Sequence, residues 1–173
     1  MFGDPAWARL KIAVDMVREG LIAPEEARQR LEGLDLSTIV RRHVTGRSGK
    51  PIAEGVAAGI GVATGRVALT IAAARAQAAQ GHRVVLVRAD IATDDIDGIA
   101  SAEGVLTARG GRTSHAAVVA REFGKVAIVG CGELRISNDG TGCVIGGQHF
   151  RDGDEITLDG ESGNIYAGSV EIE

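Results

Sequence analysis

Short apolar runs separated by amphipathic or alanine-rich segments make up the chain from Ile52 onward. Continuous runs of aliphatic and β-branched residues, typical of buried strands, fall at 84–87, 105–107 and 126–129. The alanine-rich segment Ile71–Gln80 predicts a helix that ends at Gly81. This alternation of short strands and helices predicts an α/β fold class.

Further short elements are predicted around these runs. Strands are expected at 65–69, 144–145, 155–158 and 165–166. Asp152-Gly153 and Asp159-Gly160 supply turns between the last strands. Thr93, followed by two aspartates, predicts the start of a short helix within 91–100, with Thr93 as the N-cap.

The first fifty residues have a different, helical pattern. An amphipathic helix is expected at 5–19, ending at Gly20, and a second at 24–31 with acidic residues in its first turn. Residues 37–44 are compatible with either helix or extended chain. The small and basic segment 45–51 predicts a linker. We therefore expect a helical lead-in and linker at 1–50 and a folded domain at 51–173.

Composition narrows the class of protein. The chain has 173 residues and is 45% hydrophobic, enough for one domain with a core and a small appendage. A net charge of −4 without a basic patch argues against nucleic acid as a partner, and no run is long enough to span a membrane. The N-terminus does not resemble a secretory signal, so we expect a cytoplasmic protein.

Residue types that bind metals or nucleotides occur, but in unfavourable spacings. Cys131, Cys143 and His149 do not have the spacing of a zinc site, so no metal is expected. Asp94, Asp95 and Asp97 suggest either a metal cluster or an acidic cap on a helix, and the cap is the simpler interpretation.

Two glycine-rich stretches resemble nucleotide-binding loops only in part. Gly59, Gly61 and Gly65 approximate a dinucleotide fingerprint with the wrong spacing, and a glycine-rich lead into a strand is the favoured alternative. Residues 46–50 resemble a phosphate-binding loop, but Lys50 is followed by proline rather than Ser or Thr.

Residues 104–124 combine a strand, a glycine loop and a helix that begins near a histidine. Thr113 or Ser114 is a suitable N-cap, and Gly124 is placed to end the helix. His115 therefore lies in the first turn, where unpaired N–H groups and the helix dipole disfavour imidazolium and favour an anion. Arg109, Arg112 and the two hydroxyls of Thr113 and Ser114 add hydrogen-bond donors, with Gly110 and Gly111 between the arginines.

These features fit a histidine that accepts and then donates a phosphoryl group. They also fit a capped helix that begins with an unremarkable surface histidine. Physical reasoning on the residues leaves both interpretations open.

The run 113–121, Thr-Ser-His-Ala-Ala-Val-Val-Ala-Arg, resembles the phosphohistidine motif of the phosphoenolpyruvate-utilising enzymes, above all of pyruvate, phosphate dikinase. The resemblance implies a swivelling β/β/α phosphohistidine domain at 51–173 behind a short helical lead-in, with His115 as the residue that carries phosphate. Residues 12–22 and 24–27 also resemble the segment that precedes this domain in the dikinases. Arg112 departs from the dikinase pattern, which usually has Met, and is closer to phosphoenolpyruvate synthase and to the first enzyme of the sugar phosphotransferase system.

The resemblance implies a phosphotransferase whose other parts lie outside this chain. Phosphate would travel on His115 between an ATP-grasp domain and a phosphoenolpyruvate/pyruvate-binding barrel, in cis or in trans. Mg²⁺ and a monovalent cation are expected at those partner sites and no cofactor on this chain alone. The alternatives are a phosphoenolpyruvate synthase-like carrier, or a non-catalytic regulatory or scaffolding module that mimics the swivelling domain.

Two further residues near His115 take a role from the resemblance. Thr113 corresponds to the threonine that a regulatory kinase and phosphatase modify in dikinases, although an N-cap role explains it equally well. Cys131 belongs to a Gly-Cys pair that stands near the histidine in that family. We expect it to be a packing residue, since no base or electropositive pocket accompanies it in the sequence.

Overall fold

A computed structural model describes residues 5–32 and 49–170 of the chain. The chain divides into two compact units, Met1–Arg41 and Arg42–Glu173. The expected boundary after residue 50 stays a prediction. The expected element at 37–44 lies outside the described residues. So does most of the linker at 45–51, including most of the stretch 46–50 that resembles a phosphate-binding loop.

The first unit contains a pair of helices, α1 (Pro5–Arg18) and α2 (Pro24–Arg30), which contact each other. Both helices were predicted from local sequence signals: each begins at a proline, and Gly20 follows α1. Gly20 has a positive φ of 70°, as expected for a glycine that ends a helix. Arg30 links the helices: its guanidinium bonds to Glu26 of α2 at 2.8 Å and lies 3.6 Å from the Met16 sulfur of α1.

The second unit alternates strands and helices as expected. Its first half contains β1 (Ala53–Glu54), β2 (Val56–Ala57), β3 (Val62–Ala68), α3 (Ile71–Ala79), β4 (Val84–Arg88), a 3₁₀ turn η2 (Thr93–Asp95) and α4 (Ile96–Ser101). The second half contains β5 (Gly104–Thr107), α5 (His115–Glu122), β6 (Val126–Val129), β7 (Leu134–Ile136), β8 (Gly142–Ile145), β9 (Gln148–Arg151), β10 (Glu155–Asp159) and β11 (Asn164–Ala167). No helix in the described ranges is long and apolar enough to cross a membrane.

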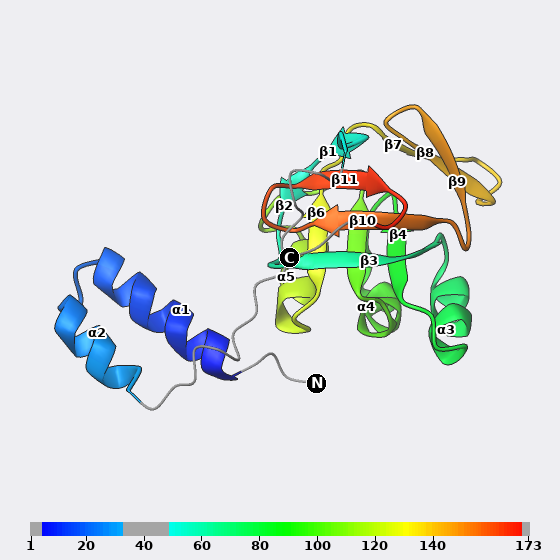
Figure 1. Ribbon diagram of the computed structural model, residues 1–173. Helices are drawn as coiled ribbons and strands as arrows, with labels where there is room; N and C mark the ends of the chain where they lie inside the picture. Colours follow the sequence, from blue (N-terminus) through cyan, green and yellow to red (C-terminus); the bar gives the residue numbers. More distant parts are fainter. Residues whose placement is uncertain (1–4, 33–48, 171–173) are drawn as a thin grey trace. The chain divides into compact units, whose positions relative to one another are not determined.

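Eight strands form one mixed sheet in the order β1-β11-β10-β3-β4-β5-β6-β2. Its centre, β3 to β6, is parallel, and the next strand on either side, β10 or β2, pairs antiparallel with it. Helices α3, α4 and α5 lie together along one face of the parallel strands (Figure 1). The α/β class is therefore confirmed.

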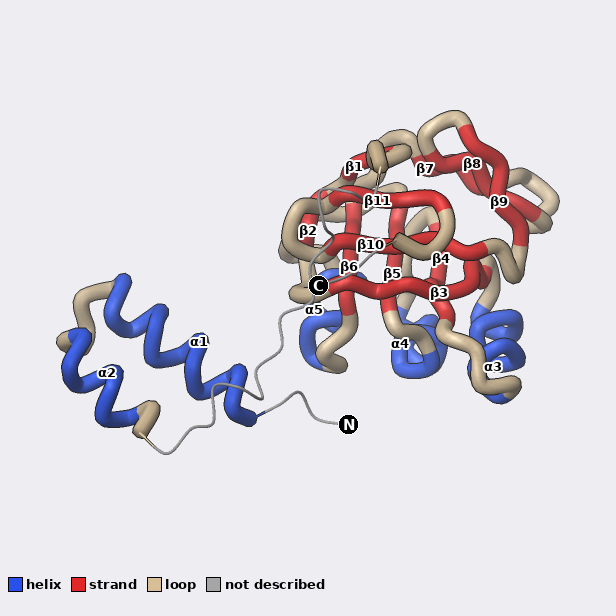
Figure 2. The backbone as a smooth tube through the Cα atoms, viewed as in Figure 1, coloured by secondary structure: helices blue, strands red, loops and turns tan. Residues whose placement is uncertain are grey.

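Alternating side chains of the central strands fill two separate cores. In β4, Val84 and Leu86 pack with the helices, whereas Val85 and Val87 pack on the opposite face. That opposite core also contains residues of the small sheet β7-β8-β9, such as Ile145 and Phe150. The layers are thus sheet, sheet and helices, the β/β/α order that the resemblance implied (Figure 2).

The glycine-rich stretch 59–65 leads into β3 and forms its first half. Gly65 lies inside β3, so the three glycines do not form a loop between a strand and a helix. A Cβ on Gly59 would lie 2.5 Å from the Lys125 carbonyl oxygen, so only glycine permits this close approach. The alternative favoured from the sequence is confirmed.

The expected N-cap at Thr93 is wrong. Thr93 lies inside the 3₁₀ turn that precedes α4, and Ala92 occupies the cap position without a side-chain bond. The carboxylate of Asp95 accepts the Ala92 N–H at 2.9 Å, which is the bond by which the third residue of a capping box holds the N-cap N–H. Asp95, one of the three acidic residues, therefore orders the start of this short helix, in line with the simpler interpretation.

Candidate functional site

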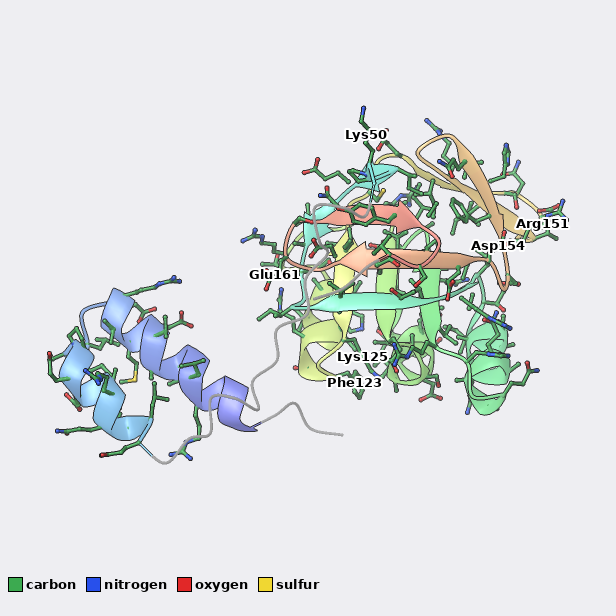
Figure 3. All side chains as sticks on the ribbon, in the orientation of Figure 1. Lys50, Phe123, Lys125, Arg151, Asp154 and Glu161 are labelled. Carbon is green, nitrogen blue, oxygen red and sulfur yellow. The ribbon has the colours of Figure 1, made fainter. Side chains whose placement is uncertain are left out.

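The unit β5–loop–α5–β6 builds the candidate site. β5 lies in the sheet between β4 and β6, and residues 108–114 leave its carboxyl end before the chain returns through α5. The carboxyl ends of parallel strands are where open α/β sheets bind ligands. Phe123 and Lys125 mark the opposite, C-terminal end of α5 (Figure 3).

Ser114 caps α5 and thereby places His115. Its extended backbone (φ −63°, ψ 157°) and the bond from the Ala117 N–H to its hydroxyl, at 3.3 Å, end the loop and begin the helix. His115 is the first residue of α5 and is exposed. The following residues Ala116 and Ala117 are buried against the sheet, which fixes the orientation of the helix behind the histidine.

The surroundings of His115 offer uncommitted hydrogen-bond donors. Within the described residues, the backbone N–H groups of His115 and Ala116 have no hydrogen-bond partner, as is normal for a first helical turn. Arg109 and Arg112 are exposed, and their guanidinium groups form no hydrogen bond or ion pair with any described residue. The free N–H groups of this first turn and the positive end of the helix dipole favour an anion at His115.

The loop that leads to His115 is tied to α5 as well as to the sheet. Arg121, two turns along α5, donates from its guanidinium to the carbonyl oxygen of Arg112 at 2.8 Å. The Ser114 N–H bonds back to the Gly111 carbonyl at 2.9 Å, so the last four loop residues form a turn. The arginine-containing loop is therefore a bonded structure rather than a loose connection.

Gly110 and Gly130 allow the loop to lie close to the end of β6. Gly110 has a φ of 106°, and a Cβ on it would lie 2.9 Å from the Ser114 hydroxyl oxygen. A Cβ on Gly130 would lie 2.5 Å from the Gly110 carbonyl oxygen. Both positions require glycine because a side chain would displace the loop.

Thr113 is exposed and is not the cap of α5, which is Ser114. The structure thus decides between the two candidates that the sequence left open. The Thr113 hydroxyl makes no hydrogen bond within the described residues and is available to solvent.

Cys131 is fully buried and contributes to the core beneath the site. Burial raises the pKa of its thiol, so the thiolate is disfavoured at neutral pH.

Cys131→Ala is expected to leave phosphoryl acceptance by the chain within about twofold of wild type, and iodoacetamide should not alkylate the native thiol at pH 7. A large loss of acceptance with an unchanged fold would show instead that the sulfur acts chemically.

Residues singled out as possible metal ligands do not gather into a site. No group of three or more His, Cys, Asp or Glu side chains in residues 5–32 and 49–170 is arranged to hold an ion. Cys143 is buried in the core of the small sheet, where burial raises the pKa of its thiol to about 11, whereas His149 is exposed on β9.

Two residues that support the site, Thr107 and Arg121, were not identified from the sequence, and Gly130 was noted only as part of the Gly-Cys pair. A polar residue that ends an otherwise apolar strand, as Thr107 does, is one signal that could have pointed to them. The bonds of Arg121 to Arg112 and of Gly130 to Arg109 join residues 9 and 21 positions apart, and sequence spacing does not reveal such contacts. The Thr107 hydroxyl bond to the Arg109 carbonyl spans only two positions.

The sequence of the chain matches a known protein family and several known proteins. Residues 80–163 match the family model described as PEP-utilising enzyme, mobile domain. Over 169 residues, 96% of this chain, the sequence is 42% identical to a pyruvate, phosphate dikinase of Clostridium symbiosum. It is also 41% identical, over 92% of the chain, to the chloroplastic pyruvate, phosphate dikinase 1 of Arabidopsis thaliana.

The chain spans 19% and 17% of the lengths of these two relatives. An NMR solution structure of an Enzyme I protein matches 51% of this chain and 32% of its own, with 27% identity and a TM-score of 0.38. Residues 80–163 thus match the mobile domain of PEP-utilising enzymes, and over nearly its whole length the chain is homologous to one segment of pyruvate, phosphate dikinase, a phosphotransferase.

Proposed function

We propose that this chain is a phosphoryl carrier of a pyruvate, phosphate dikinase-like phosphotransferase, with His115 as the residue that carries phosphate. The observation that carries the proposal is the placement of His115: exposed, first in α5, and at the free N–H groups of the first turn, after a loop with two exposed arginines. Homology to a dikinase segment supports the same role.

The chemistry is two successive phosphoryl transfers. A nitrogen of the neutral His115 imidazole attacks the phosphorus of the donor, an N–P bond forms, and the P–O bond to the leaving group breaks with its electron pair on that oxygen. In the second step an acceptor oxygen attacks the same phosphorus and the N–P bond breaks. The first turn of α5, Arg109 and Arg112 would stabilise the anionic group on the histidine.

The donor and acceptor sites are proposed to lie on other parts, in cis or in trans. These are an ATP-grasp domain and a phosphoenolpyruvate/pyruvate-binding barrel, and any Mg²⁺ and monovalent cation would be held there. The described residues of this chain hold no ligand group for such an ion. What the chain itself contributes is a positioned nucleophile and a cationic loop.

The test supplies a donor that cannot use its own histidine. The chain is incubated with phosphoenolpyruvate, Mg²⁺ and the Clostridium symbiosum dikinase from which the histidine domain has been removed, and binding of the two proteins is verified by gel filtration. Intact mass is then recorded at alkaline pH, where a phosphoramidate survives. We expect a gain of one phosphoryl group. No gain from a bound partner would favour the scaffolding alternative.

We further propose that Thr113 is a regulatory phosphorylation site. Its hydroxyl is exposed and is not used as a cap, so modification would cost no structural bond. A phosphate on Thr113 would place about −1.5 to −2 charges two residues from His115 and would repel an incoming phosphoryl donor.

Thr113→Glu is expected to slow phosphoryl acceptance by roughly tenfold, because even one negative charge opposes the anionic donor at short range. Thr113→Gln has the same shape without the charge and should accept phosphate at close to the wild-type rate. Equal rates for the two variants would contradict an electrostatic block.

A further inference from the structure

Thr107 is a polar side chain that is completely buried at the carboxyl end of β5. The other three residues of this strand, Gly104, Val105 and Leu106, are buried and bring no polar side chain. A buried hydroxyl is retained only where it forms a hydrogen bond, since an unpaired one is costly. Its partner therefore indicates what it does.

The Thr107 hydroxyl donates to the carbonyl oxygen of Arg109 at 2.6 Å. The same carbonyl accepts the Gly130 N–H at 3.3 Å, and the Thr107 carbonyl accepts the Cys131 N–H at 3.0 Å. Two donors, one from β5 and one from the segment after β6, therefore hold the first peptide of the loop. The Arg109 N–H in turn bonds to the Ala89 carbonyl after β4, at 3.0 Å.

We infer that Thr107 is a positioning residue for His115, acting through the Arg109 carbonyl. From that peptide the chain runs through Gly110, whose carbonyl packs against the Cα of Gly130, to the Gly111–Ser114 turn and then to His115. The direction in which the chain leaves Arg109 sets where this turn lies. Removing the hydroxyl leaves the Arg109 carbonyl with only the longer bond from Gly130.

Two substitutions separate the hydroxyl from its methyl group. Thr107→Val keeps the shape and the strand preference of the side chain but removes the hydrogen bond. Thr107→Ser keeps the hydroxyl and removes a buried methyl group, so it is the variant that damages packing. If Thr107 served only for packing, Thr107→Ser would impair the chain more than Thr107→Val. If Thr107 positions the loop through its hydroxyl, Thr107→Val would impair it more.

The inference rests on the proposed carrier function, so the readout is the rate at which His115 accepts phosphate from phosphoenolpyruvate and the histidine-deleted dikinase. At saturating carrier concentration, Thr107→Val should be slower by about ten- to a hundredfold, since small displacements of a reacting group have effects of this size. Thr107→Ser should stay within about threefold of wild type. Affinity for the dikinase, measured by calorimetry, should be unchanged in both.

A second measurement needs no partner. Amide hydrogen exchange at Ser114 and Gly130 reports the loop bonds directly, and it should be about tenfold faster in Thr107→Val than in Thr107→Ser. Failure of the wild-type chain to accept phosphate would overturn the carrier function, whereas the exchange pattern would still test the loop. Equal acceptance by wild type and Thr107→Val, or a greater defect in Thr107→Ser, would overturn the inference.

Discussion

His115→Ala is expected to abolish phosphoryl acceptance, because no other side chain at the start of α5 is a nucleophile of the same kind. The fold should persist. His115 is exposed, and the buried face of α5 is made by Ala116, Ala117, Val119 and Ala120, which the substitution leaves in place. Exposed positions of this sort change stability by about 0.5 kcal/mol or less.

His149→Ala is the matched control for this experiment. His149 is also exposed, but it lies on β9 in the small sheet, away from the β5–α5 loop. The measurement is intact mass at alkaline pH, with circular dichroism as the check on folding. Retained labelling in His115→Ala, loss of labelling in His149→Ala, or a collapsed spectrum in His115→Ala would contradict the assignment of the carrier residue.

Gly130→Ala is expected to have the second largest effect, on stability and acceptance together. Gly130 has a φ of 65°, a conformation that costs a residue with a Cβ about 1 kcal/mol. The added Cβ would also lie 2.5 Å from the Gly110 carbonyl oxygen, and overpacking of this kind adds about 1–3 kcal/mol. The sum is about 3 kcal/mol, with the loop before His115 pushed away from β6.

Gly124→Ala isolates the backbone contribution, since Gly124 has the same φ of 65° but nothing within 4 Å of an added Cβ. Urea unfolding of the two variants should give about 1 kcal/mol for Gly124→Ala and about 3 kcal/mol for Gly130→Ala. Only Gly130→Ala should also slow phosphoryl acceptance in protein that remains folded. Equal losses of stability would show that the close approach of Gly110 to Gly130 is unimportant.

Elements with strong local signals were predicted well from the sequence. α5 has a polar cap, a first turn with His115, an apolar buried face and a terminating glycine, all within eleven residues, 114–124. β4, β5 and β6 were found because their aliphatic runs are buried on both faces. These features depend on near neighbours and on burial, which a sequence pattern records directly.

Elements that depend on distant partners were missed. β1 and β2 are two residues each and exist because Ala53 pairs with Ile165 and Val56 with Val129. β7 and β9 likewise form only as the outer strands of the small sheet around β8. The Thr93 cap was wrong for a different, local reason, since Asp95, three residues after Ala92, orders the helix start with its own side chain.

The sequence by itself determined the α/β class, the helix that carries His115 and the cationic loop before it, because helix caps, glycine stops and apolar runs act over a few residues. Only the tertiary structure decided that Ser114 rather than Thr113 caps α5 and that Thr107 and Gly130 hold the Arg109 carbonyl. The Gly130 bond to that carbonyl forms only when the ends of β5 and β6 lie side by side in the sheet. The pairing of parallel strands across a helical crossover is a long-range property, and short-range sequence patterns do not specify it.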